Sequence, residues 1–228
     1  MQRLYKGIQK FQQLHHKKDE EFYSELSKGQ SPDVLFFACS DSRVDPNLIT
    51  QSKPGELFIV KNVGNIIPAN GPRWNKSCTA AAIEFSLLVL KVPDIVICGH
   101  SDCGAMKALY YDEKDFSEMP NLKDWVNTAK NVKEAVEHEK NPDPSYKARK
   151  ELTEKMHVML QIENLMSYPL VKEAVEEEKL TLHGWYYDIG TGLVHAYDRH
   201  NNTFEPIQCD DDDLIGPVLK RDSCSDAQ

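Results

Sequence analysis

Three short stretches of uninterrupted apolar residues constrain the fold of this 228-residue chain more than any other feature. They are VLFFAC at residues 34–39, LFIV at 57–60 and IVIC at 95–98. Such runs are typical of strands buried on both faces, as in a parallel sheet covered by helices. The segment SCTAAAIEFSLLVLK, between the second and third runs, has the alanine and leucine content and the length of a covering helix. We therefore predict an α/β fold with a central, mostly parallel β-sheet flanked by helices.

The segments outside these runs add further elements to the predicted fold. Residues 1–28 carry apolar side chains at helical spacing, so we expect one or two amphipathic N-terminal helices that lie on a larger body. Residues 180–207 alternate between apolar and polar and contain GTG and NN turns, which predict a strand, a hairpin and another strand, one of them an added edge strand. We expect a single domain over residues 1–208 and an acidic tail over 209–228 that is extended or partly disordered.

Charge and composition exclude several classes of protein. The net charge of -9 argues against a nucleic-acid partner, because phosphate binding requires a basic patch. No stretch reaches the roughly 18 to 20 apolar residues of a membrane span, and the N-terminus lacks the features of a signal peptide, so we expect a cytoplasmic protein with no membrane partner. Six cysteines are too few for a secreted disulfide scaffold, and no C-x-x-C redox pair occurs. Their remaining uses are packing, metal binding or catalysis.

The residues that can carry chemistry follow the first and third apolar runs. CSDSR begins at Cys39, and GHSDCG contains His100 and Cys103. In parallel sheets, ligands bind beyond the carboxyl ends of the strands, where these segments would meet. Cysteine sulfur and histidine nitrogen are preferred ligands of Zn²⁺, and three protein ligands leave one position open, as in catalytic zinc sites. We therefore predict a zinc site formed by Cys39, His100 and Cys103.

The segment CGHSDCG offers two cysteines, of which one is assigned to the metal. Cys98 belongs to the apolar run IVIC, where a thiol packs as a small apolar group. Cys103 lies beyond the strand, beside Gly104 at the start of a predicted helix, and the N-terminal dipole of that helix favours a thiolate. We assign Cys103 to the metal and Cys98 to the core of the sheet.

Two segments, about 60 residues apart, closely resemble the paired signature motifs of the β-class carbonic anhydrases. They are Cys39-Ser40-Asp41-Ser42-Arg43-Val44 and His100-Ser101-Asp102-Cys103-Gly104. LFIVKNVGNIIP, AAAIEFSLLVLKV and LHGWYYDIGTG are also similar to family segments, and the resemblance covers most of residues 1–200. It implies a zinc lyase that hydrates carbon dioxide reversibly to bicarbonate and a proton, through attack of hydroxide bound to the zinc.

The resemblance also implies roles for Asp41 and Arg43 beside the metal. Asp41 would accept a hydrogen bond from the hydroxide and orient it, while Arg43 would hold Asp41 ionised as a planar bidentate donor. In another state of the family the matching aspartate binds zinc, so Asp41 is also a conditional fourth ligand. Phe36 and Ala38 stand where members with a non-catalytic bicarbonate site carry tryptophan and glycine. We therefore expect an open site here.

A substrate pocket, built in part by a second subunit, is a further implication of the resemblance. Phe85 stands where many relatives have tyrosine, so this pocket would lack that hydroxyl group. The chain would function as a homodimer or a higher homo-oligomer. The matched pocket positions are Gln30, Phe58, Val63, Phe85 and Gly104.

Two alternatives to carbon dioxide hydration stay open. The same metal and fold could serve hydrolysis of carbon disulfide or carbonyl sulfide, which would require a restricted entrance. A non-enzymatic zinc-binding scaffold protein is the second alternative, and degraded ligands or a lost Asp–Arg pair would be expected in that case. Both the ligands and the pair are intact in this sequence.

Overall fold

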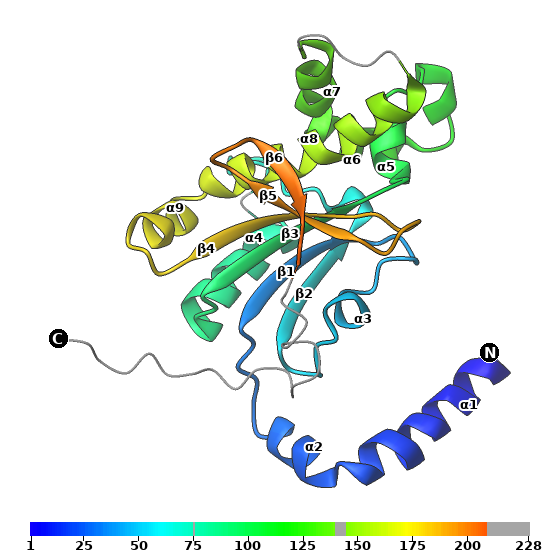
Figure 1. Ribbon diagram of the computed structural model, residues 1–228, viewed down its shortest axis with the longest axis vertical. Helices are drawn as coiled ribbons and strands as arrows, with labels where there is room; N and C mark the ends of the chain where they lie inside the picture. Colours follow the sequence, from blue (N-terminus) through cyan, green and yellow to red (C-terminus); the bar gives the residue numbers. More distant parts are fainter. Residues whose placement is uncertain (75, 140–144, 209–228) are drawn as a thin grey trace.

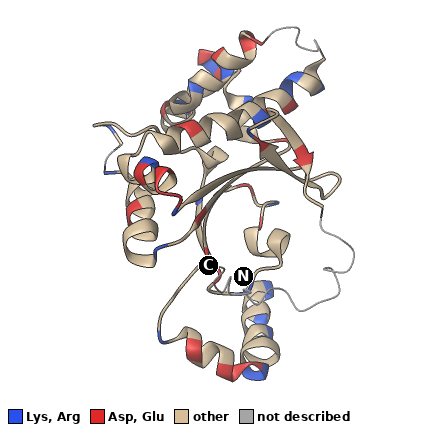
Figure 2. Cartoon of the chain, turned by 60° about the vertical axis from the view of Figure 1, so that its left-hand side comes forward, with Lys and Arg blue, Asp and Glu red and all other residues tan. Residues whose placement is uncertain are grey.

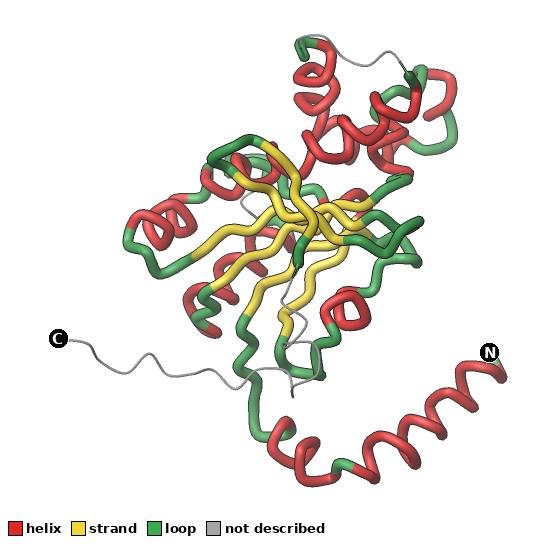
Figure 3. Tube along the Cα trace, in the orientation of Figure 1, coloured by secondary structure: helices red, strands yellow, loops and turns green. Residues whose placement is uncertain are grey.

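The computed structural model describes residues 1–74, 76–139 and 145–208. In this part of the chain, six strands form one sheet in the order β2-β1-β3-β4-β5-β6, between layers of helices (Figures 1 and 3). The first four strands are parallel to one another, and β5 and β6 are antiparallel. The strands are β1 (Val34–Cys39), β2 (Leu57–Asn62), β3 (Asp94–His100), β4 (Thr181–Tyr187), β5 (Val194–Asp198) and β6 (Thr203–Pro206).

The predicted α/β class and the mostly parallel sheet are confirmed. The three apolar runs form β1, β2 and β3, and residues 180–207 supply three further strands. Of these, β4 extends the parallel part of the sheet, and both β5 and β6 add antiparallel strands beyond it. Two antiparallel strands, rather than a single edge strand, therefore extend the sheet on this side.

Alternation along β1 divides the core between the two faces of the sheet, because successive strand side chains point to opposite faces. Leu35 and Phe37 pack with the helices α4, α8 and α9 on one face. Phe36 and Ala38 pack with Val96 and other residues on the opposite face, which α3 covers. The flanking helices are α3 (Pro46–Thr50), α4 (Cys78–Glu84, continued by a π-helical turn over Phe85–Leu90), α5 (Gly104–Ala108), α6 (Pro120–Val126), α7 (Lys130–Glu137), α8 (Tyr146–Met166) and α9 (Pro169–Glu176).

The N-terminal helices α1 (Gln2–Lys10) and α2 (Glu20–Leu26) form an arm that extends away from the sheet (Figure 1). Every side chain of residues 1–21 is exposed, and Leu4 and Ile8 are each 54% exposed. The predicted N-terminal helices are present. Helix α2 contacts the body, with Lys53 Nζ 5.8 Å from the centroid of the Phe22 ring, whereas the apolar side chains of α1 are exposed in the described part of the chain. The helical spacing of apolar residues in the N-terminal segment predicts an apolar stripe on the helix, but it does not identify the surface that covers this stripe.

Charged residues lie mainly on the helices (Figure 2). None of the helices in the described part of the chain combines the length and apolar character needed to span a bilayer. The predicted acidic tail, residues 209–228, lies outside the described residues. The division into one domain over residues 1–208 and a tail therefore stays a prediction.

Candidate metal centre

Three buried side chains meet at the carboxyl edge of the parallel strands. Cys39 ends β1, His100 ends the neighbouring strand β3, and Cys103 immediately precedes α5. Their ligand atoms all lie within 4.8 Å of one another. Each of the three residues is at most 5% exposed. The structure thus brings together the three ligands predicted from the sequence, because adjacent parallel strands end side by side.

The hydrogen bonds of His100 leave one ring nitrogen for a metal. Nδ1 lies 2.9 Å from the carbonyl oxygen of Ser101, so Nδ1 carries the proton and donates it to that oxygen. Nε2 is then an acceptor, and it is buried without a hydrogen-bond partner among the described residues. Since buried polar atoms are normally satisfied, an unpartnered Nε2 aimed at two sulfur atoms fits a metal ligand.

The two thiols have opposite shifts in pKa. The hydrogen bond from Cys103 lowers the pKa of Cys39 to about 4, and N–H groups of Asp41 and Gly64 also donate to its Sγ, at 3.4 and 3.3 Å. The hydrogen bond to Cys39, together with burial, raises the pKa of Cys103 well above its ordinary value. Without a cation, one proton therefore remains between the two sulfurs. A divalent cation can replace that proton, and two sulfurs with one imidazole nitrogen suit Zn²⁺.

Asp41 and Arg43 form a bidentate ion pair beside this cluster. Arg43 donates from Nε to Asp41 Oδ1 at 2.9 Å and from Nη2 to Oδ2 at 2.7 Å, and its backbone N–H also reaches Oδ1 at 2.9 Å. These hydrogen bonds hold the pKa of Asp41 well below its usual range. Arg43 Nη2 also donates to the carbonyl oxygen of Asp102 at 3.1 Å, which joins the two motif segments. With both oxygens on Arg43, the Asp41 carboxylate is not a member of the three-ligand cluster.

A cavity of about 300 Å³ opens beside the cluster. Val63 and Gly104, two of the predicted pocket residues, line it, and Leu122 adds an apolar wall that the sequence did not single out. The cavity is mostly apolar, with Asp41 at its polar side. Its lining residues are Cys39, Ser40, Asp41, Val63, Gly104, Ala105 and Leu122.

The other three predicted pocket residues do not line the cavity beside the cluster of their own chain. Phe58 pairs in register with Leu35, four residues before Cys39, so it lies on the order of 13 Å back along the strands. Its ring contacts that of Phe85, with centroids 5.8 Å apart, and Phe85 is 40% exposed. Gln30 is exposed in the segment before β1. None of these three side chains is among those that line the cavity of the same subunit.

Helix α8 contributes two buried residues that sequence reasoning missed. Glu154 Oε1 accepts the backbone N–H of Cys103 at 3.1 Å. Burial lowers the pKa of His157 to about 4, so its ring is neutral, and Nε2 donates to the carbonyl oxygen of Gly64 at 2.7 Å. Gly64 is the residue whose N–H bonds to Cys39. The available signal was a set of polar residues on the apolar side of the segment TEKMHVMLQIENL, residues 153–165.

This geometry defines a class of α/β protein with a buried cluster of two cysteines and one histidine, which could hold a metal ion, at the carboxyl edge of a parallel sheet. Residues 34–194 match the family model described as carbonic anhydrase. A carbonic anhydrase of Helicobacter pylori (strain J99) is 35% identical over 204 residues, which cover 89% of this chain and 92% of that protein. The chain belongs to the β-class carbonic anhydrases, a family of zinc-dependent enzymes that hydrate carbon dioxide.

Solved structures agree with this assignment. The β-carbonic anhydrase CcaA is 37% identical, with a TM-score of 0.84 over 91% of this chain and 99% of that chain. A structure from a study of two tetrameric β-carbonic anhydrases of the ascomycete Sordaria macrospora is 29% identical. Its TM-score is 0.76 over 86% of this chain and 95% of that chain.

Proposed function

We propose that this chain catalyses the reversible hydration of carbon dioxide to bicarbonate and a proton, with Zn²⁺ held by Cys39, His100 and Cys103. The observation that carries the proposal is the unpartnered Nε2 of His100, clustered within 4.8 Å of two cysteine sulfurs beside an arginine-held carboxylate. When bound, zinc supplies the Lewis acidity that makes water a nucleophile at neutral pH.

Asp41 orients the nucleophile, and Arg43 positions Asp41. Each carboxylate oxygen has more than one lone pair, so Asp41 can accept a further hydrogen bond while both oxygens stay on Arg43. The lowered pKa of Asp41 keeps it ionised, and therefore an acceptor, throughout the neutral range. For Asp41 to become a fourth ligand, the carboxylate would have to give up its Arg43 bonds, which supports an open site.

The cavity walls suit carbon dioxide, which has no net dipole. Val63, Ala105 and Leu122 provide apolar surface next to Asp41. The backbone of Gly104 lines the same cavity, and its N–H is the proposed donor to a substrate oxygen. A mostly apolar wall with few polar groups is the usual composition of a small-molecule site.

The proposed functional unit is a homodimer or a larger homo-oligomer, in which Gln30, Phe58 and Phe85 reach the pocket of the partner. Three observations support this. These residues do not line the cavity beside the cluster of their own chain. The edge strand β2 and the helical turn after α4 expose apolar side chains, namely Ile59, Phe85, Leu88 and Val89. The relatives from Sordaria macrospora are tetrameric.

We place the protein in the cytoplasm, where a reducing environment keeps Cys39 and Cys103 as thiols.

Stopped-flow measurement of carbon dioxide hydration, with metal analysis of the same sample, tests the proposal. The wild-type chain should carry zinc and hydrate carbon dioxide. Asp41→Asn should keep its zinc and lose activity on the order of 100-fold, because the nucleophile is no longer oriented. Glu173→Gln, an exposed change of the same kind on α9, should leave both unchanged. A zinc-loaded wild type without hydration activity would contradict the proposal; a carbon disulfide assay would then separate a related hydrolase from a scaffold.

A further inference from the structure

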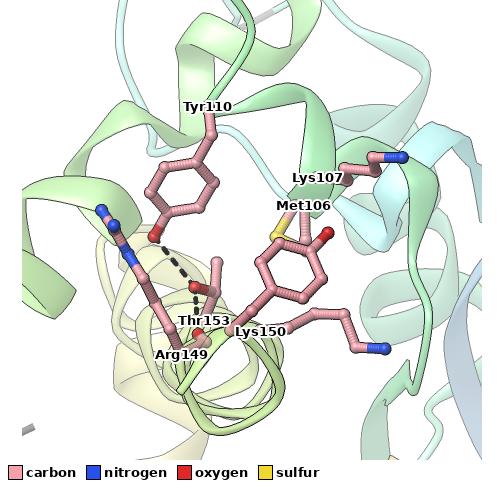
Figure 4. A pocket seen from close by; sticks show the side chains of 7 residues that line it. Met106, Lys107, Tyr110, Arg149, Lys150 and Thr153 are labelled. Carbon is pink, nitrogen blue, oxygen red and sulfur yellow. Dashed lines mark hydrogen bonds between the residues drawn. The ribbon is translucent and has the colours of Figure 1, made fainter. Parts of the chain in front are cut away.

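We propose that a second cavity, between α5 and the first turns of α8, is a binding site for a small aromatic carboxylate (Figure 4). The cavity has a volume of about 150 Å³ and shares no lining residue with the cavity at the metal centre. It is lined by Met106, Lys107, Tyr110, Tyr146, Arg149, Lys150 and Thr153.

The whole cavity is large enough for one aromatic ring, and its buried wall is mostly apolar. Met106 and Thr153 are buried, and the side chain of Tyr110 stands beside them (Figure 4). The Tyr110 hydroxyl and Thr153 Oγ1 lie 2.9 Å apart, and Thr153 in turn donates to the carbonyl oxygen of Arg149 at 2.7 Å. These polar atoms are therefore satisfied within the wall. An apolar cavity of about this volume, roughly 150 Å³, is large enough to bind benzene in another protein.

The outer part of the cavity favours a single negative charge. Lys107 and Lys150 lie on one side, and Arg149 lies beside Tyr110 on the other (Figure 4). Lys150 is paired with Asp102, and Arg149 has Glu137 at 3.9 Å. Lys107 forms no ion pair within the described ranges. Among the described residues, one positive charge is thus left without a balancing carboxylate, which matches a carboxylate more closely than a doubly charged phosphate.

Tyr146 gives the site an aromatic partner at its mouth. It is the first residue of α8, and its side chain is 70% exposed although it lines the cavity. A bound ring would cover part of this exposed face, and aromatic pairs gain stability beyond the area that they bury. An aromatic carboxylate therefore fits this cavity: its ring matches the volume and the aromatic side chain of Tyr146, and its carboxylate matches the positive charge of Lys107.

Calorimetric titration of the zinc-loaded full chain with benzoate tests the proposal. Benzoate should bind at least ten times more tightly than benzamide, which lacks the charge, or acetate, which lacks the ring. The double variant Lys107→Met with Lys150→Met should weaken benzoate binding at least tenfold, and Tyr146→Ala at least threefold. Lys147→Met, an exposed change on the same helix that does not line the cavity, should leave binding unchanged.

The position of the ligand is read from nuclear Overhauser effects between benzoate ring protons and ¹³C-labelled methionine methyl groups. The Met106 signal, assigned with Met106→Leu, should show these effects. The proposal is overturned if benzoate does not bind, or if it binds with equal affinity to the wild type and to the well-folded variants at Lys107, Lys150 and Tyr146. Effects on other methionines without Met106 would overturn it as well. None of these readouts uses carbonic anhydrase activity, so they are independent of the proposed function.

Discussion

At the scale of single residues, two cysteines in one short segment have opposite environments. Cys98 is fully buried with Phe36 and Val96 on the face of the sheet away from the metal centre. Burial raises the pKa of Cys98 to about 12, so it stays a neutral thiol. Cys103 lies past the end of β3 and shares a proton with Cys39. The end of the strand thus separates a packing thiol from a proposed ligand.

These environments predict different results for two alanine substitutions. Cys103→Ala should abolish zinc retention, because one of the three ligands is lost. Cys98→Ala should retain zinc and cost about 1 kcal/mol of the free energy of unfolding, since a small buried group leaves a small cavity. Metal analysis after dialysis, together with thermal unfolding, measures both effects. Equal loss of zinc in the two variants would show that the ligand assignment is wrong.

At the scale of elements, helix α8 supports the loop that carries Cys103 and the turn at Gly64, whose N–H donates to Cys39. Glu154 and His157 are three residues apart and therefore share one helix face. Glu154 binds the backbone of Cys103 and also accepts from the Tyr186 hydroxyl at 3.0 Å. His157 fixes Gly64, which sits in the left-handed region at φ 82° and donates to Cys39. A side chain at Gly64 would bring its Cβ to 2.7 Å from the Cβ of Ala105, so this contact also requires glycine.

We expect His157 to be a positioning residue for the metal centre. His157→Leu removes the donor to Gly64 and should weaken the binding of cobalt(II) to the metal-free protein by roughly 10 to 100-fold. His157→Gln, whose amide can still donate, should restore most of the affinity. Absorption of the cobalt–thiolate complex measures this binding, and thermal unfolding is recorded in parallel. A merely structural role would lower the melting temperature of His157→Leu and leave its cobalt affinity equal to that of the wild type.

The site residues predicted from the sequence lie at the ends of strands, whereas those that were missed lie on a helix. Cys39 and His100 follow continuous apolar runs, and the rule that parallel strands end at one edge predicts their meeting. Glu154 and His157 come from a helix about 50 residues further along the chain. The spacing of polar and apolar residues along a helix does not distinguish a polar side chain that faces water from one that binds a buried loop, so the sequence did not reveal their role. The proposed roles of Gln30 and Phe58 involve a second subunit, so neither the sequence nor the structure of one chain tests them.

At the scale of the whole molecule, two groups of apolar side chains are exposed in the described part of the subunit. One is the stripe on the N-terminal arm that includes Leu4 and Ile8. The other comprises Ile59 on the edge strand β2 and the side chains of Phe85 and Leu88 after α4. Extended apolar surface on a subunit is typical of an interface with another protein. The proposed homo-oligomer would cover both surfaces and would give Phe58 a role in the pocket of the partner.

Removing the apolar side chains of the arm should therefore weaken self-association. Leu4, Ile8, Phe11 and Leu14, each changed to serine, would remove side chains worth roughly 1.5 to 3 kcal/mol each when buried. We expect the dissociation constant of the dimer to rise at least 100-fold, as measured by sedimentation equilibrium. Lys6→Gln with Lys10→Gln, polar changes on the same helix, should leave it unchanged. An unaltered dissociation constant in the serine variant would show that the arm does not contribute to the interface.

Mixing two inactive variants tests whether Phe58 serves the pocket of the partner subunit. A Phe58→Ser chain keeps the zinc ligands, whereas a Cys103→Ala chain keeps Phe58 and lacks a metal centre. In a mixed dimer, the intact zinc site of the first chain faces the intact Phe58 of the second. Equal amounts, exchanged through reversible dissociation, should therefore recover roughly one quarter of the wild-type carbon dioxide hydration per chain, because half of the dimers are mixed and each holds one complete site. If Phe58 acted in its own subunit, every zinc site in the mixture would stay defective and no activity would return.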